Sequence, residues 1–451
     1  MAWLVPVLLF PVFGCLFYIF VQLQMETKIL AKRIADIRIR TRSYLKQNEA
    51  IAAKLMKENR RNANLSRYLS ERAGYPVYDR TNFKYYPLGD DFFPDLLEEL
   101  KAAERFIFLE YFIIQRGEMW DSVLKILEEK AAAGVDVRVL YDGMNSFSNL
   151  PHDYPKELEA RGVRCRIFNP IRPAISTSQN NRDHRKILVI DGHTAFTGGI
   201  NLADEYINRK VRFGHWKDNA VRLKGEAVKS FTVMFLQMWS VCAFRPEYDF
   251  DYGPFLDTGD HFHSPALNMD GYSIPFSDSP LDGEPVGHQV YLDILYQARR
   301  YVYIMTPYLI LDDDMVTALT YAAKRGVDTV IVMPHIPDKK YAFMLAHSYY
   351  PELMEAGVKI YEYLPGFIHS KTFVSDDEKA VVGSINMDFR SQYLNFECAV
   401  YIYKNPVIGD IRADFDETLK KCVRMSMESY ESLPLMHRFW GRTLRLIAPL
   451  M

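Results

Sequence analysis

Apolar residues occur along this chain in two kinds of segment, short strand-like runs and longer runs with helical spacing. Residues 105–114 form a largely apolar run with the length of a buried strand, and residues 135–141 form another. Between them, residues 120–133 carry apolar side chains at the spacing of an amphipathic helix. This order predicts one β-α-β unit.

The same unit returns later in the chain. Residues 300–310 and 327–333 are strand-like, residues 314–324 have helical spacing, and Gly134 and Gly326 occupy matched turns after the two helices. Strands that alternate with helices favour mainly parallel sheets with helices on both faces. We therefore predict an α/β fold with two similar domains related by a pseudo-twofold axis.

The period of the repeat sets the predicted domain organisation. His184 and His369 stand in matching segments 185 residues apart, which is the period of a domain and not of a solenoid. Residues 245–279 are rich in Asp, Gly, Pro and aromatic residues and show little periodicity, so we expect the boundary there. The predicted domains cover residues 71–246 and 247–432.

The amino terminus has the pattern of a membrane segment. Residues 1–25 contain no charged side chain and supply the roughly 20 apolar positions that cross a bilayer. Pro6 and Pro11 would kink such a helix without excluding it. A cleaved signal peptide is the alternative, but no basic residue precedes the run and no small-x-small site follows it. We therefore predict a lasting transmembrane anchor over residues 1–24.

Basic residues dominate the next segment, residues 25–70, which has a helical pattern. By the positive-inside rule these charges place the following domains on the cytoplasmic side. They would attract anionic lipid headgroups, or else form a solvated linker helix that only fixes topology. At the other end, residues 433–451 mix arginines with Phe439 and Trp440, which is typical of an amphipathic membrane-proximal segment. A helix packed on the domain is the alternative there.

The composition is that of a folded globular protein, with 49% hydrophobic and 25% charged residues in a chain of 451. The net charge of -2 argues against a protein whose main partner is nucleic acid. The five cysteines are scattered and never form a C-x-x-C pair, so they predict neither a disulfide framework nor a zinc site.

The candidate chemistry lies in two motifs of the same design. His184 and Lys186 stand two residues apart, as do His369 and Lys371, each in strand-like sequence beyond its own β-α-β unit. Residues two apart share one face of a strand, so each pair presents an imidazole beside an ammonium. Such a lysine neutralises phosphate oxygens while the histidine attacks phosphorus or donates a proton. Duplication in matching contexts favours one shared site over two exposed salt-bridging pairs.

Acidic residues accompany both motifs. The spacing H-x-K-x4-D groups Asp191 and Asp376 with the catalytic residues, but on an unbroken strand they would face away from the histidines. We therefore expect both to act as supports. Asp218 and Glu397 precede matching strands further along, and we expect each to orient the imidazole of its own domain.

A turn of small residues follows each motif, Gly-Gly-Ile-Asn in the first half and Gly-Ser-Ile-Asn in the second. These turns permit close backbone approach and offer donors to phosphate oxygens. Metal binding is the competing use of His and Asp, but the lysine beside each histidine would repel a cation, so we predict no metal. The predicted substrate-binding residues are Gly199, Asn201, Ser384 and Asn386.

Together these motifs resemble the phospholipase D superfamily, and within it the chain is similar to the bacterial cardiolipin synthases. The likeness runs from about residue 70 to the end. Members of that family often carry two apolar amino-terminal helices, whereas one is visible here, which indicates either a shorter branch or a chain that begins late. The closer match is carried by FLEYF (108–112), NRDHRKI (181–187), GGIN (198–201), TPY (306–308), GVKIYEY (357–363) and GSINMDFRS (383–391).

The resemblance implies a two-step transfer through a phosphatidyl-histidine, without metal or other cofactor. One phosphatidylglycerol would release glycerol, and the hydroxyl of a second would accept the phosphatidyl group to form cardiolipin. We expect His184 as the nucleophile and His369 as acid and then base. The expected site is the cytoplasmic face of the bacterial inner membrane, with anionic lipids as partners. Expected pocket residues, with strand-end packing as the equal alternative, are Glu110, Tyr111, Thr306 and Tyr308.

Three other functions compete with this prediction. A hydrolytic phospholipase D, or another phosphatidyltransferase, would use the same motifs. A nuclease is disfavoured by the net charge and by the lack of a basic groove interleaved with aromatic residues. A non-catalytic membrane scaffold is disfavoured because both motifs are intact.

Overall fold

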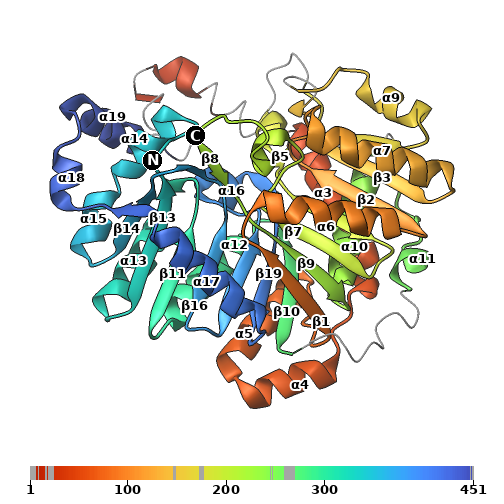
Figure 1. Ribbon diagram of the computed structural model, residues 1–451, viewed down its shortest axis with the longest axis horizontal. Coiled ribbons are helices and arrows are strands. Elements are labelled where there is room, and N and C mark those ends of the chain that lie inside the picture. Colours follow the sequence, from red (N-terminus) through yellow and green to blue (C-terminus); the bar gives the residue numbers. More distant parts are fainter. Residues whose placement is uncertain are drawn as a thin grey trace.

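Two α/β domains lie side by side in the computed structural model, each built on its own large sheet (Figure 1). The structure describes the whole chain except residues 1–6, 9, 16–17, 19–24, 146–148, 172–176, 244, 246, 258–269, 447 and 449–451.

The first sheet has the strand order β1-β9-β7-β6-β2-β3-β4. The predicted β-α-β unit is confirmed as β2, α7 and β3, with β2 and β3 parallel. The strands are β1 (Thr81–Tyr86), β2 (Phe106–Tyr111), β3 (Asp136–Asp142), β4 (Arg164–Phe168), β6 (Lys186–Ile190), β7 (Thr194–Gly198) and β9 (Ala220–Gly225), and the helices are α6 (Gly89–Ala102), α7 (Glu118–Ala132), α9 (Tyr154–Ala160) and α10 (Val228–Val241).

The second sheet has the order β10-β19-β17-β16-β11-β13-β14-β20. Its predicted unit is confirmed as β11, α13 and β13, again with parallel strands. The strands are β10 (Tyr272–Asp278), β11 (Tyr301–Met305), β13 (Asp328–Pro334), β14 (Lys359–Tyr363), β16 (Thr372–Ser375), β17 (Lys379–Gly383), β19 (Asn395–Tyr403) and β20 (Cys422–Arg424), and the helices include α12 (Val286–Gln297), α13 (Asp313–Lys324), α14 (Lys340–His347), α15 (Tyr350–Glu355), α16 (Phe389–Tyr393) and α17 (Val407–Leu419).

The prediction of mainly parallel sheets is wrong, because both sheets are mixed. In the first sheet β2, β3 and β4 are parallel, whereas β2, β6, β7, β9 and β1 follow one another in antiparallel pairs. The cause is the connection between β6 and β7, a tight turn at residues 191–193. So short a turn joins antiparallel neighbours only, since a parallel crossover needs a dozen or more residues.

Short strand pairs also join the two domains. β5 (Arg182–Asp183) pairs with β19, and β15 (Gly366–Ile368) pairs with β8 (His215–Lys217), both in parallel. One apolar core cluster includes Phe106 and Val221 of the first domain together with Ile274 and Val302 of the second. The domain boundaries at 246/247 and 432 stay a prediction, but the domains share a continuous core.

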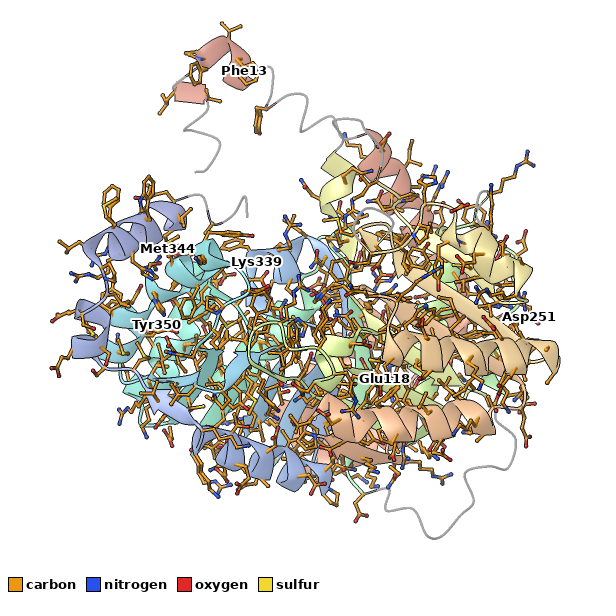
Figure 2. All side chains as sticks on the ribbon, turned by 45° about the horizontal axis from the view of Figure 1, so that its top comes forward. Phe13, Glu118, Asp251, Lys339, Met344 and Tyr350 are labelled. Atoms are coloured by element: carbon orange, nitrogen blue, oxygen red, sulfur yellow. The ribbon has the colours of Figure 1, made fainter. Side chains whose placement is uncertain are left out.

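The basic amino-terminal segment is not a single free helix. It forms α3 (Met25–Thr41), α4 (Glu49–Glu58) and α5 (Arg60–Tyr68), and Ile37 and Leu55 are buried against the body of the protein. The predicted anchor over residues 1–24 lies largely outside the described residues. Within the described part of the chain, no helix is both long and apolar enough to cross a bilayer. The described residues around Phe13 stand apart from the two domains (Figure 2).

Asp191 and Asp376 anchor the starts of two central strands. Asp191 accepts backbone N–H groups of Glu104, Arg105 and Phe106, each at 2.8 Å, as the chain enters β2. Asp376 does the same at β11, where it accepts the N–H groups of residues 299 to 301 at 2.8–3.0 Å. Each aspartate therefore fixes one strand that flanks a histidine-bearing segment.

We predict that Asp191→Ala lowers the free energy of unfolding by about 2–4 kcal/mol, because three backbone donors lose a charged acceptor. Asp191→Asn should cost less, since one acceptor oxygen remains. Thermal unfolding of the purified chain measures both. The control is Asp249→Ala, whose side chain is 97% exposed. An Asp191→Ala protein as stable as this control would contradict the anchoring role.

Candidate active site

Each H-x-K segment is held by the backbone of the other domain. The His184 N–H donates to the Phe396 carbonyl at 2.9 Å, and the His369 N–H donates to the Lys217 carbonyl at 2.7 Å. These bonds continue the β5–β19 and β15–β8 pairings, so both histidines lie where the domains meet. Across this meeting point, the charge of Lys371 contributes to a lowered pKa of His184.

The two lysines are buried beside their own histidines, but His184, His369 and Lys371 lie between strands and not within one, so strand parity is not what pairs them. Lys186 Nζ donates to the His184 carbonyl at 2.5 Å, and Lys371 Nζ donates to the His369 carbonyl. Each lysine is only 1% exposed. Two ammonium groups are therefore held in a site with little water to screen them, which suits an anionic substrate group.

The carboxylates cross between the domains. His184 Nδ1 lies 2.9 and 3.0 Å from the two carboxylate oxygens of Glu397, and His369 Nδ1 lies 2.6 Å from Asp218 Oδ2. The expectation that each carboxylate serves its own domain is wrong. Asp218 directly follows β8, which pairs with β15 just before His369, so its side chain meets the other motif. In each pair Nδ1–H can donate to the carboxylate, which leaves Nε2 for the substrate.

Different neighbours support the two carboxylates. Glu397 accepts hydrogen bonds from Ser384 Oγ and from Ser391 Oγ, the latter at 2.6 Å. Asp218 instead packs on Gly199, where an added Cβ would lie 2.1 Å from Oδ1. The two turns thus differ in how they support a carboxylate. Gly199 leaves space for the shorter Asp218 side chain, whereas Ser384 binds the longer Glu397 side chain through its hydroxyl. Both residues serve the carboxylates, which is not the substrate contact that we predicted from the sequence.

Aromatic rings surround the imidazoles. Tyr206, Trp216 and Phe367 have ring centroids 5.4, 5.6 and 5.9 Å from that of His369, and Phe112 lies 4.9 Å from His184. Sequence reasoning did not find these rings as site residues. Phe112 lies 72 residues before His184 and Tyr206 lies 163 residues before His369, and no spacing rule marks either ring.

The predicted asparagines have mainly structural contacts. Asn201 accepts the Ile113 N–H at 3.0 Å and donates to the Tyr206 hydroxyl at 2.7 Å, so it supports a ring that touches His369. The Asn386 N–H donates to Ser391 Oγ at 2.8 Å, and its side-chain oxygen is buried with no hydrogen-bond partner among the described residues. Asn386 thus retains a free acceptor near the Glu397 support.

Asp191 and Asp376 are not placed with the reacting groups. Asp191 is five residues beyond Lys186 along β6, which is about 16 Å on an extended strand. The motif spacing groups both aspartates with the catalytic residues, and this position does not agree with that grouping. It agrees with the supporting role that we expected from strand parity.

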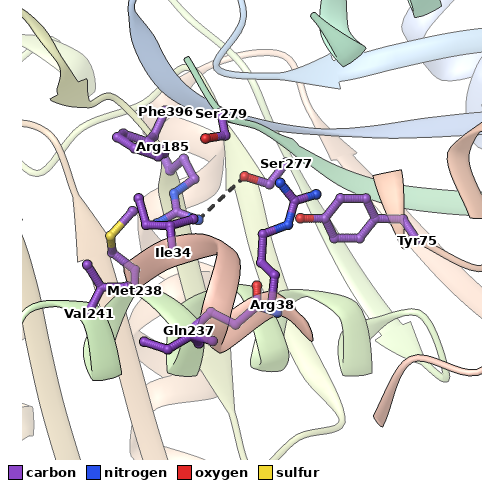
Figure 3. A pocket seen from close by; sticks show the side chains of 11 residues that line it. Ile34, Arg38, Tyr75, Arg185, Gln237, Met238, Val241, Ser277, Ser279 and Phe396 are labelled. Atoms are coloured by element: carbon purple, nitrogen blue, oxygen red, sulfur yellow. Dashed lines mark hydrogen bonds between the residues drawn. The ribbon is translucent and has the colours of Figure 1, made fainter. Parts of the chain in front are cut away.

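Glu110 and Tyr111 lie in the packed interior of the first domain. Glu110 is fully buried and pairs with Arg185, and burial raises its pKa. Arg185 lines a cavity of about 30 Å³ beneath α3, where it reaches Ser277 Oγ at 3.5 Å (Figure 3). Tyr111 belongs to the core cluster on the other face of the sheet. These contacts agree with strand packing, the alternative to substrate binding.

Thr306 and Tyr308 have separate roles at the end of β11. The Thr306 hydroxyl donates to the Tyr308 carbonyl at 2.9 Å and accepts the Met387 N–H at 3.2 Å, so it shapes the turn. The Tyr308 hydroxyl donates to Asp338 at 2.5 Å, and Lys339 Nζ lies 4.9 Å from the centroid of its ring. Lys339 also acts electrostatically on His184. Lys339 is exposed, and no motif in the sequence pointed to it.

The family model described as "Cardiolipin synthase, PLD-like domain" matches residues 96–239 and 291–419, together more than half of the chain and one stretch in each domain. The chain belongs to this family.

Relatives of this phospholipase D-like chain extend over its full length. An "Uncharacterized protein" of Streptococcus mutans is 50% identical over 100% of this chain and 96% of its own. A "Cardiolipin synthase" of Alkalihalophilus pseudofirmus is 34% identical over 100% of this chain and 88% of its own. The crystal structure of phosphatidylserine synthase of Haemophilus influenzae has a TM-score of 0.64 at 14% identity and covers 87% of this chain and 100% of its own, which shows the fold.

Burial and nearby lysine charges favour the neutral form of both imidazoles in the absence of substrate. Burial, followed by the charges of Lys186, Lys371 and Lys339, lowers the pKa of His184 well below its usual range. Burial and Lys371 lower the pKa of His369 to about 3, although Asp218 opposes this change. A bound phosphate would offset the lysine charges and favour the imidazolium.

The other charged groups of the site are perturbed as well. Burial lowers the pKa of Lys186 to about 8 and that of Lys371 to about 7, and burial raises the pKa of Glu397 to about 7. Burial opposes ionisation of Asp218, but His369 and Lys371 outweigh it, so the Asp218 pKa is lowered. Among the described residues, no group of three or more His, Cys, Asp or Glu side chains is arranged to hold a metal ion.

We predict that Gly199→Ala lowers kcat by about 100-fold or more, because its Cβ would displace Asp218 from His369 and spoil the orientation of the imidazole. The matched control is Gly409→Ala, since a Cβ at that position meets no atom within 4 Å. Steady-state kinetics with folded protein checks both. Equal activity of the two variants would show that the Asp218 position does not matter.

We also predict that kcat/KM falls as the pH rises through about 7 to 8, because Lys371 and then Lys186 lose their positive charge. The kcat/KM profile reports groups of the free enzyme. Lys371→Arg should move the fall to higher pH, since arginine stays charged. A profile that is flat to pH 9 in the unmodified protein would contradict the lysine assignment.

Proposed function

We propose that the protein is a phospholipid phosphatidyltransferase, and more narrowly a cardiolipin synthase that joins two phosphatidylglycerol molecules with release of glycerol. The crossed histidine–carboxylate pairs, each with a buried lysine, carry the proposal, because they offer two acid–base groups and two cations to one phosphodiester. Relatives named cardiolipin synthase at about one-third identity support the narrower reaction.

In the first step His184 Nε2 attacks phosphorus, and the bond from phosphorus to the glycerol headgroup oxygen breaks. Lys186 and Lys371 balance the charge of the phosphoryl oxygens. His369 gives its proton to the departing glycerol oxygen, so the phosphatidyl group is left on His184. Glu397 orients His184 during the attack, and Asp218 stabilises the His369 imidazolium.

In the second step His369 takes the proton of a headgroup hydroxyl on a second phosphatidylglycerol. That oxygen attacks phosphorus, the bond to His184 breaks, and cardiolipin leaves. Each proton and each bond is thereby restored at the end of the cycle. The lysines supply the cationic charge throughout.

The electrostatics support His184 as the nucleophile. Three lysines disfavour protonation of His184, so its nitrogen keeps a free electron pair. Asp218 stays ionised at neutral pH because its pKa is lowered, and its charge favours a protonated His369 once phosphate has bound. The first step needs a neutral nucleophile and a protonated partner, and His369 must take up that proton as phosphate binds, because its pKa is about 3 in the free site.

We further propose that the catalytic domains lie on the cytoplasmic face of a bacterial inner membrane, with anionic phospholipids as partners. The uncharged segment 1–25 and the basic residues that follow it support this orientation.

Purified protein given only phosphatidylglycerol is expected to form cardiolipin and free glycerol in equal amounts, measured by mass spectrometry. His184→Asn and His369→Asn should each lower turnover by about 1,000-fold or more. A quenched reaction should carry the phosphatidyl adduct on the peptide that contains His184.

Other products would redirect the proposal. Phosphatidic acid without cardiolipin would indicate a hydrolytic phospholipase D. Cardiolipin that forms only when phosphatidylethanolamine is added would show that the donor or acceptor is wrong. Full activity of either histidine variant would exclude the shared site.

A further inference from the structure

Helix α19 (Leu435–Arg445) exposes an apolar stripe. The stripe residues recur at spacings of three and four, which aligns them along one side of a helix. Contiguous exposed apolar surface of this kind marks an interaction site. Its members and their exposed fractions are Leu435 (76%), Met436 (61%), Phe439 (59%), Trp440 (48%) and, at the helix end, Leu446 (73%).

The opposite side of α19 is fixed on α14. An added Cβ at Gly441 would lie 2.3 Å from the Met344 carbonyl oxygen, so the two helices touch through backbone. His437 Nε2 lies 3.0 Å from His347 Nδ1 on α14, and Arg445 pairs with Glu352 of α15 at 2.9 Å. The packing therefore holds the apolar stripe outward.

The charge of α19 matches an anionic surface. The helix contains no acidic residue, and it carries Arg438, Arg442 and Arg445. Arg442 is exposed at the edge of the stripe, where its charged end can reach headgroups while the apolar side chains lie deeper.

Other features on the same side of the molecule agree with a lipid surface. Phe13 is 66% exposed, and Leu8, Phe10 and Val12 are 65–77% exposed. Figure 2 shows Phe13 on the side of the molecule toward which Met344 and Lys339 lie. Phe13 and the labelled residues at α14 therefore lie on the same side of the molecule in this view.

Helix α14 connects this surface with the candidate active site. Lys339 directly precedes α14, stands over Tyr308 and acts electrostatically on His184. The helix that holds α19 thus begins at Lys339, whose ammonium lies over the ring of Tyr308. A molecule seated on a bilayer through α19 would bring that end of the site to the headgroups.

We propose that α19 is an interfacial helix that lies in the headgroup region of an anionic phospholipid bilayer and seats the α14 side of the active site at that surface. Binding of α19 to the bilayer does not depend on which reaction the protein catalyses. Only the effect of this binding on turnover rests on the proposed function.

The docking is tested with the full chain reconstituted into vesicles of phosphatidylcholine and phosphatidylglycerol with brominated acyl chains. The difference between the unmodified protein and Trp440→Phe isolates the Trp440 emission from that of the other four tryptophans. We expect bromine to lower this emission about twofold or more, because an interfacial helix buries its apolar face several ångströms below the headgroups.

Two results would overturn the docking. One is Trp440 emission that responds neither to brominated lipid nor to vesicles. The other is protection of Trp440 from an aqueous quencher without any effect of bromine, which would show that protein, such as a second copy of the chain, covers α19.

The effect on turnover is tested with Phe439→Glu. We expect about tenfold slower cardiolipin formation in phosphatidylglycerol vesicles, because a charge opposes insertion, and an unchanged rate with short-chain phosphatidylglycerol dissolved as monomers. The control is Tyr321→Glu, which places the same charge at a 53% exposed position on α13 and should change neither rate. Equal vesicle rates for the two variants would overturn the seating role. If even the unmodified protein forms no cardiolipin, the proposed function fails while the Trp440 experiment still decides the docking.

Discussion

The hydrogen bond from each catalytic-motif imidazole to a carboxylate of the other domain is the constraint on which the rest of the structure depends. His184 meets Glu397 and His369 meets Asp218, so neither domain holds a complete site. The short parallel pairs β5–β19 and β15–β8 place these partners, and the shared core keeps them in register. Two similar halves therefore act as one unit because each completes the other.

Burial gives the crossed pairs their chemical character. Two lysines with 1% exposure would be costly in an empty site, and their lowered pKa values show that cost. A phosphodiester supplies the missing negative charge, so binding relieves the repulsion and favours protonation of the imidazole that must act as acid. The repulsion between the two lysines in the free site thus favours binding of an anionic phosphate substrate.

Local sequence rules predicted the residues of this site, but not that each carboxylate pairs with the histidine of the other domain. The two-residue spacing placed His184 beside Lys186, and strand parity separated Asp191 from them. Asp218 and His369 are 151 residues apart, and no local rule indicates that β8 pairs with β15 of the other domain. The β-α-β repeat predicts parallel strands throughout, whereas the Asp191-Gly192 turn, a hairpin signal, joins antiparallel neighbours. No sequence motif marks Lys339, and only the folded chain lets its charge contribute to the lowered pKa of His184.

The crossed pairing is tested most directly by nitrogen NMR of protein labelled at histidine, with His184 and His369 assigned from their Asn variants. With crossed pairs, Asp218→Asn is expected to shift the His369 ring resonances and leave those of His184 in place, and Glu397→Gln is expected to do the reverse. A shift of His184 alone in Asp218→Asn would show that each carboxylate serves its own domain and that the pairs are not crossed.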